Sequence, residues 1–81
     1  MKVTVLLFAR PRELVGRSRL EINVDESSSP ASVFRDLCAR TPALGTLRDG
    51  LRCAIDQEYA NWDDRLADGS ELAFISPIAG G

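Results

Sequence analysis

Hydrophobic and polar residues alternate along several short stretches of the chain, and this alternation predicts β-strands because successive side chains of a strand point to opposite faces. In the first stretch Val3, Val5 and Leu7 share one face, which leaves Leu6 and Phe8 on the other. Together with apolar runs bounded by turn residues, the pattern predicts strands over residues 3–8, 19–24, 51–56, 59–61 and 71–75. A strand with this alternation has one face for a core and one face that points away from it.

A helical period replaces the alternation after residue 29. Ser29 is suited to cap a helix, Pro30 to occupy its first position, and Pro42 to end it. The apolar stripe that this helix presents consists of Val33, Phe34, Leu37 and Cys38. A shorter helical turn is predicted over residues 11–16, between the first two strands, with Gly16 at its end.

The order of elements is β-β-α-β-β-β, which is typical of an α+β fold with a mixed sheet and one main helix packed on one face. We therefore predict a β-grasp (ubiquitin-like) domain over residues 1–75 and a flexible tail over residues 76–81. The predicted core consists of Val3, Val5, Leu7, Leu20, Ile22, Val24, Phe34, Leu37, Ile55, Leu66, Leu72 and Phe74.

The composition excludes several classes of function. A chain of 81 residues has room for one core only. The formal net charge of −2 argues against nucleic acid as the main ligand. No apolar run is long enough to span a membrane, so no membrane partner is expected.

The chain contains no histidine and two cysteines, Cys38 and Cys53. This set is too small for a zinc site, so no bound metal is expected. Both cysteines lie among apolar residues and are predicted to be buried free thiols, which suits a reducing cytoplasm. The chain also lacks a nucleophile–histidine pair and a glycine-rich phosphate loop, and a free-standing enzyme is therefore not expected.

The sequence ends on SPIAGG, with two glycines at positions 80 and 81. Glycine loses more backbone entropy on ordering than any other residue, so it is a poor terminal anchor. One interpretation is a frayed end without function. The alternative is that the carboxylate of Gly81 is itself the reactive group.

Three segments, taken in order, resemble the small, sulfur-carrier subunits of molybdopterin synthase, which are bacterial ubiquitin-like proteins. The segments are LLFARPRELVG near the start, AIDQEYA in the middle, and LADGSELAFISPIAGG at the end. The resemblance covers essentially the whole chain. Asp56, Ser70 and Ser76 depart from residues common in that family, and none of these changes touches the terminal glycines.

The resemblance implies a non-catalytic carrier whose Gly81 is adenylated, converted to a thiocarboxylate (1-thioglycine) and used to donate sulfur to cyclic pyranopterin monophosphate in molybdenum cofactor biosynthesis. Gly81 is then both the catalytic and the modified residue. No cofactor would be bound, and ATP would be consumed by the partner that activates the chain.

The implied partners are the large subunit of the synthase, which holds the active site, a ubiquitin-activating-like adenylyltransferase, and a sulfurtransferase that supplies the sulfur. The working form implied is a heterotetramer of two small and two large subunits. The residues predicted to enter the partner's active site are Pro77, Ile78, Ala79 and Gly80.

Strand alternation also predicts where partners bind. If the first and last strands are neighbours, Phe8 and Ile75 lie together on the face opposite the helix, with Tyr59 nearby. Apolar groups that gather on an exposed face beside a reactive tail indicate a docking surface. The alternative is that they are scattered surface residues without function.

Three other functions remain open from the sequence. A sulfur carrier for another product, such as the thiazole of thiamine, would also end in Gly-Gly. A ubiquitin-like modifier would join Gly81 to lysines of target proteins. A plain interaction module would carry an inert tail.

Overall fold

The computed structural model describes residues 1–77. Its elements, in chain order, are β1 (Lys2–Leu7), α1 (Ala9–Val15), β2 (Arg19–Asn23), α2 (Pro30–Arg40), the 3-10 helix η1 (Pro42–Gly50), β3 (Arg52–Ile55), β4 (Glu58–Ala60) and β5 (Glu71–Ile75). Within this part of the chain, none of the helices is long and apolar enough to cross a membrane.

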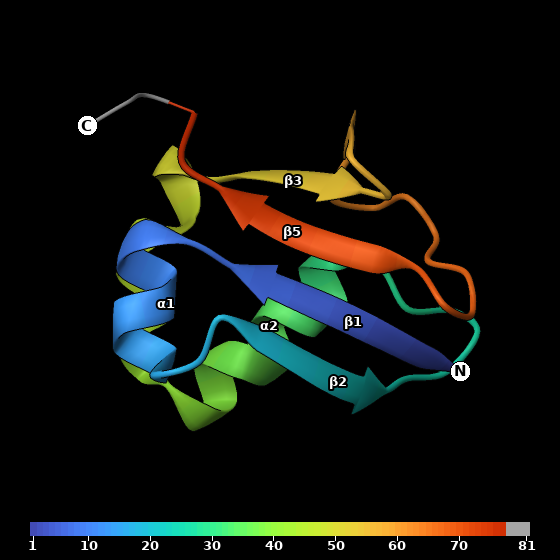
Figure 1. Cartoon of the computed structure of the whole chain (residues 1–81), viewed down its shortest axis with the longest axis horizontal. Coiled ribbons are helices and arrows are strands. Elements are labelled where there is room, and N and C mark those ends of the chain that lie inside the picture. The colour runs from blue at the N-terminus through green and yellow to red at the C-terminus, as the bar shows by residue number, and fades with distance from the viewer. Residues whose placement is uncertain (78–81) are drawn as a thin grey trace.

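The five strands form one mixed sheet in the order β2-β1-β5-β3-β4. The central pair, β1 and β5, is parallel, and the other neighbouring strands are antiparallel. Helix α2 crosses one face of this sheet, behind the strands in Figure 1. This arrangement confirms the predicted α+β, β-grasp fold, and it makes the first and last strands direct neighbours as expected.

Local sequence explains where α2 begins and ends. Ser29 accepts a hydrogen bond from the backbone N–H of Ser32, and the Ser32 hydroxyl accepts one from the backbone N–H of Ser29, which completes a capping box. Pro30 occupies the first turn, where its missing N–H costs nothing. Thr41 and Pro42 follow the last turn, and the chain tightens there into η1.

The core lies between α2 and the sheet. Phe34 of α2 makes edge-on contacts with Trp62 and with Phe74 of β5, at centroid distances of 5.7 and 5.2 Å. Trp62 also stacks on Phe74 at 5.6 Å, and the Arg48 guanidinium lies 3.5 Å from the centre of the Trp62 ring. The predicted core residues that are buried are Val3, Val5, Leu7, Phe34, Leu37, Leu66, Leu72 and Phe74.

Four of the predicted core residues are only partly buried and pack at its margin: Leu20, Ile22, Val24 and Ile55. The first two belong to β2, which is an edge strand with a neighbour on one side only. The predicted core also omitted buried residues, among them Leu44 in η1, a segment without a regular apolar period, and Leu51 at the start of the third predicted strand.

Two further expectations need correction. Helix α1 begins at Ala9 rather than Pro11, although Gly16 ends it in the predicted left-handed conformation with φ 85°. Both cysteines are free, but Cys53 is buried whereas Cys38 is only partly buried. The difference arises because Cys53 faces the core from a strand, and Cys38 lies at the edge of the helix stripe.

Candidate functional site

The sheet face opposite α2, which we call the open face, has a continuous apolar centre. The pairing registers place five residues directly opposite one another across all five strands, in the order Arg19, Leu6, Ala73, Ala54 and Tyr59. Since residues paired in register point to the same side of a sheet, this row crosses the open face from edge to edge.

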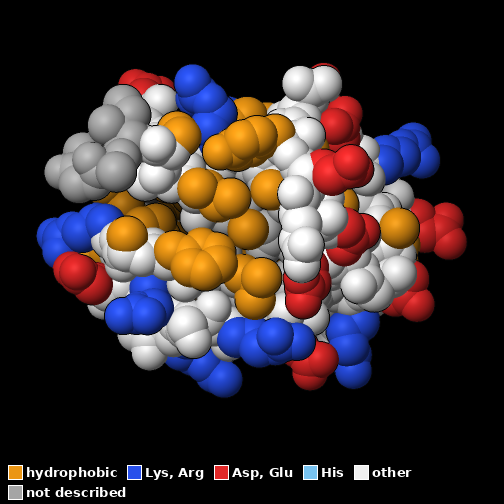
Figure 2. Space-filling model, turned by 45° about the horizontal axis from the view of Figure 1, so that its top comes forward, with side chains coloured by type: hydrophobic (Ala, Val, Ile, Leu, Met, Phe, Trp, Pro, Cys, Tyr) orange, Lys and Arg blue, Asp and Glu red, His pale blue; other side chains and the backbone are white. Residues whose placement is uncertain are grey.

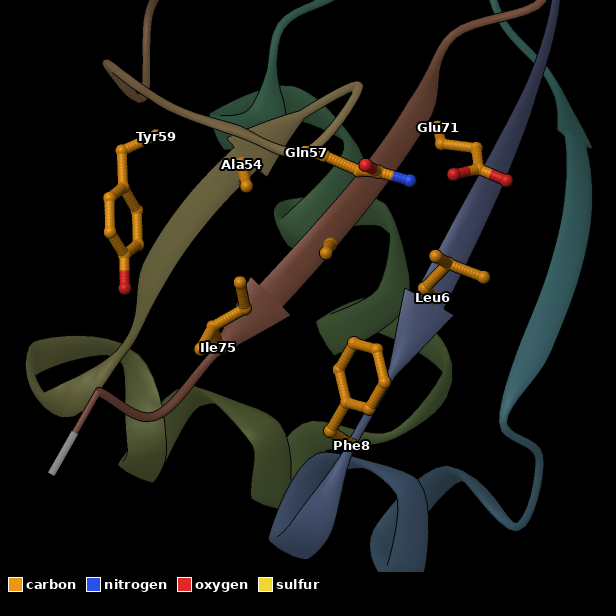
Figure 3. A pocket seen from close by; sticks show the side chains of 8 residues that line it. Leu6, Phe8, Ala54, Gln57, Tyr59, Glu71 and Ile75 are labelled. Carbon is orange, nitrogen blue, oxygen red and sulfur yellow. The ribbon is translucent and has the colours of Figure 1, made fainter. Parts of the chain in front are cut away.

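A hollow of about 460 Å³ lies on the open face over β1, β5 and β3. Its lining residues are Leu6, Phe8, Ala54, Gln57, Tyr59, Glu71, Ala73 and Ile75. Figure 3 shows Phe8 and Ile75 at one end of this hollow, Tyr59 at its side, and Gln57 and Glu71 toward the other end. Its lining is mainly apolar, with polar side chains at the end away from Phe8.

The hollow brings together the three residues that strand alternation placed near one another. Phe8 is 50% exposed and Tyr59 is 70% exposed, whereas Ile75 is partly buried. Large hydrophobic side chains this exposed do not stabilise the fold by burial, so they are available to another molecule. The part that these side chains play in docking stays a prediction.

Sequence reasoning did not include the polar end of the hollow. The sequence pattern places Gln57 between two predicted strands and Glu71 at the start of the last one, and it assigns neither residue to a site. The sequence position of Glu71 could have revealed it. Glu71 lies two residues before Ala73 and four before Ile75, and alternate residues of a strand share a face, so Glu71 points to the open face with them.

Backbone conformation fixes Phe8 at the rim of the hollow. Phe8 is extended, with φ −129° and ψ 158°, and Ala9 then adopts a positive φ of 50°. A left-handed conformation is uncommon for a residue with a Cβ and costs about 1–2 kcal/mol. The chain therefore leaves the open face abruptly after Phe8 and enters α1.

The opposite end of the hollow is fixed by the turn between β3 and β4. Asp56 and Gln57 both have positive φ, 51° and 73°, which is typical of a tight two-residue hairpin loop. The Asp56 carboxylate accepts a hydrogen bond of 2.9 Å from the backbone N–H of Glu71, and the Asp56 N–H donates one of 2.8 Å to the Glu71 carbonyl. The turn is thus attached to the start of β5.

Strand β5 leads from the hollow toward the end of the chain. Its last residue is Ile75, and Ser76 and Pro77 follow as exposed residues outside the sheet. The predicted tail residues Ile78, Ala79, Gly80 and Gly81 lie outside the described residues. Their roles, and the role of Pro77, stay predictions.

Among residues 1–77, no group of three or more His, Cys, Asp or Glu side chains is placed to hold a metal ion. The buried Cys53 thiol donates a hydrogen bond to the Ala60 carbonyl at 3.2 Å, and burial raises its pKa. Burial also raises the pKa of Cys38, so neither thiol is poised as a nucleophile.

The space-filling view shows that the apolar centre is one continuous patch. In Figure 2 hydrophobic side chains gather in the middle of the visible face, acidic ones cluster at its right, and basic ones lie along its lower edge and toward the grey residues. Among the described residues, Phe8 and Tyr59 are the large hydrophobic side chains most exposed to solvent.

Comparison with known proteins adds four likenesses. The ThiS family matches residues 5–81. The molybdopterin synthase sulfur carrier subunit of Aedes aegypti is 39% identical over 90 residues, which cover the whole of this chain and 90% of the relative. Among solved structures, SAMP1 from Haloferax volcanii has a TM-score of 0.83 at 26% identity, with all of both chains covered. A chain from the complex of subunits 1 and 2 of the molybdopterin-converting factor of Helicobacter pylori has a TM-score of 0.68 at 18% identity, again over all of both chains.

Proposed function

This chain belongs to the ThiS family, and we propose that it is the sulfur carrier subunit of a molybdopterin synthase. The observation that carries the proposal is the match to a curated carrier subunit, which covers the whole of this chain as far as its own terminal Gly-Gly. The apolar hollow beside the exit of β5 supports it, because a carrier must dock on other proteins and present its tail to them.

The chemistry assigned to Gly81 begins with activation of its carboxylate. A carboxylate resists attack by sulfur because its carbonyl carbon is electron-rich and oxide is a poor leaving group. Transfer of AMP from ATP to the carboxylate oxygen releases pyrophosphate and supplies a good leaving group. A persulfide sulfur then displaces AMP, and a thiol reduces the resulting acyl disulfide to leave a thiocarboxylate on Gly81.

The composition of the tail suits entry into a narrow active site. From Leu72 to Gly81 the chain has no charged side chain that would have to lose its hydration. The two terminal glycines have no Cβ, so catalytic groups of a partner can approach the backbone closely. Residues 76–81, if extended at ~3.3 Å each, reach about 20 Å beyond the sheet.

The partners proposed are a large synthase subunit, a ubiquitin-activating-like adenylyltransferase and a sulfurtransferase. The large subunit would hold the active site in a heterotetramer, and the complex of subunits 1 and 2 from Helicobacter pylori is a precedent for such pairing in a protein of the same fold. ATP would be consumed by the adenylyltransferase, in the cytoplasm, and this chain itself would hold no cofactor.

A second candidate function is protein modification. SAMP1 from Haloferax volcanii, a small archaeal modifier protein, shares the fold along the whole chain. A modifier would use the same adenylate on Gly81 but transfer it to lysines of target proteins. The higher identity of the curated carrier subunit favours sulfur transfer, and it also favours molybdopterin over another product such as the thiazole of thiamine.

Deletion of Gly81 tests the proposed function. The truncated chain should melt at the temperature of the wild type, because residue 81 lies beyond the last strand of the sheet. It should form no thiocarboxylate and support no molybdopterin synthesis when mixed with ATP, the activating enzyme, a sulfur donor and the large subunit. Full sulfur transfer by the chain that ends at Gly80 would contradict the assignment of Gly81.

A further inference from the structure

Charged residues on the open face are unevenly distributed along the direction of β5, with two carboxylates and Lys2 at one end and arginines from the middle of the strand to the other end. At the end where β5 begins, the register places Glu21, Thr4 and Glu71 in one row across three strands. At the end where β5 finishes, Arg52 pairs with Ile75. Arg19 pairs with Leu6 at the sheet edge, level with Ala73 in the middle of β5. The apolar hollow thus lies between a mainly acidic row and Arg52, and in Figure 2 acidic side chains cluster at the right of the apolar patch while basic ones follow its lower edge.

These charges are not neutralised by one another. The one ion pair among residues 1–77 joins Arg10 to Glu13 on α1, so neither Arg19, Arg52, Glu21 nor Glu71 has an opposite charge within 4.0 Å in that part of the chain. Glu71 and Ile75 are separated by four residues of strand, or about 13 Å. That separation exceeds the screening length of about 8 Å at physiological ionic strength, so a docked partner experiences the two ends separately.

We propose that the open face selects a partner surface of opposite polarity, in which an apolar side chain fills the hollow, carboxylates face Arg19 and Arg52, and a basic group faces Glu71. This inference rests on the proposed function and adds a determinant of orientation to it. Apolar burial is non-directional, so the hollow alone would allow the partner to rotate about the sheet normal. The charges fix that rotation, and the tail that follows Ile75 then leaves in a single direction.

The occupant is a different protein rather than a second copy of this chain. A two-fold symmetric dimer would also place the basic end of one copy against the acidic end of the other. Charge alone therefore permits either a different protein or a second copy as the occupant. Self-pairing, however, would direct the two tails away from each other at opposite ends of the interface, where neither meets a partner's active site. The carrier function requires that the tail and the open face engage the same protein.

The test exchanges the two ends at constant net charge. The variant Arg52→Glu with Glu71→Lys exchanges the charges at the two ends of β5 on the open face without altering the overall charge. Its matched control, Arg35→Glu with Asp36→Lys, makes the same exchange on exposed positions of α2, on the other side of the sheet. Melting temperatures of both variants verify that they are folded, and each is titrated against the purified large subunit at low and at high salt.

We expect the open-face exchange to weaken binding by about tenfold or more at low salt and by less at high salt, whereas the α2 exchange binds like the wild type. The single variants Arg52→Glu and Glu71→Lys should each weaken binding by about three- to tenfold, although they change the net charge in opposite directions. If one single variant weakens binding and the other strengthens it, bulk charge decides and the inference is wrong.

Two further outcomes separate this inference from the function on which it rests. Wild-type affinity in the open-face exchange variant would overturn the inference and leave the carrier function intact. A wild-type chain that does not bind the large subunit, and instead forms dimers that the exchange dissociates in sedimentation, would overturn both.

Discussion

The two faces of the sheet differ sharply, although neighbouring residues of the same strands build them. On the face covered by α2, Val5 and Leu72 are fully buried and Phe74 is 1% exposed. On the open face, Phe8 is 50% exposed and Tyr59 is 70% exposed. Both faces are apolar at their centres, so hydrophobicity does not distinguish them. What distinguishes them is whether this chain supplies the cover.

The difference assigns separate physical tasks to the two faces. Full burial of one large apolar side chain contributes about 1.5–3 kcal/mol to stability, so the covered face holds the domain together. The exposed side chains of the open face contribute little to stability, and in the proposed docking their burial would contribute to binding. We therefore expect substitutions on the covered face to lower stability, and substitutions on the open face to lower affinity.

The largest expected effect is on the covered face. Phe34→Ala should lower the free energy of unfolding by roughly 3–5 kcal/mol, because it removes a ring that is 6% exposed and contacts both Trp62 and Phe74. In a domain of this size such a loss can unfold most molecules. Urea denaturation monitored by circular dichroism measures it. A loss under about 1 kcal/mol would mean that Phe34 is not an anchor of the core.

Substitutions on the open face are expected to lower stability less than Phe34→Ala does, but to lower the affinity for partner proteins strongly. Phe8→Ala combined with Ile75→Ala removes two apolar side chains from one end of the hollow. The double variant should bind the large subunit and the activating enzyme more weakly, with little change in melting temperature, because Phe8 is half exposed and Ile75 only partly buried.

Calorimetric titration of the double variant against each partner measures the loss of affinity. If both partners use the open face, they also compete for the wild-type chain. Wild-type affinity of the double variant for both partners would place the interface elsewhere on the molecule.

The smallest expected effect concerns the residue at which the chain leaves the open face. Ala9→Gly relieves a positive φ but adds entropy to the unfolded chain, so stability should change by less than about 1 kcal/mol. Ala9→Val places a branched side chain in the same conformation and should destabilise the domain by about 1–2 kcal/mol. Thermal unfolding of the two variants checks the contrast, and equal melting temperatures would contradict the left-handed conformation.

The sequence predicts the strands well because their signal is local. Successive side chains of a strand point to opposite faces, which assigns Val5 to the core and Leu6 to the open face, and both assignments are confirmed. The same parity predicted that Phe8 and Ile75 lie together, once the first and last strands were taken as neighbours. The helix was predictable from Ser29 and Pro30 for the same reason, since a cap is a local feature.

Features that depend on tertiary context were not predictable. Leu44 is buried in a 3-10 helix that has no regular apolar period, and Trp62 joins the core from a loop. Leu20 and Ile22 alternate as core residues do, but their strand lies at the sheet edge. The polar end of the hollow depends on a hydrogen-bonded attachment of Asp56 to Glu71, two residues 15 positions apart.

The most direct test of the carrier function is the intact mass of the protein after incubation with ATP, its activating enzyme and a sulfur donor. We predict a mass gain equal to the exchange of one oxygen for sulfur, located at Gly81 by fragmentation and absent when ATP is left out. Conjugates of higher mass on lysines of other proteins, without the sulfur exchange, would identify a modifier instead. An unchanged mass in the presence of all components would contradict the assignment of Gly81 as the site of sulfur transfer.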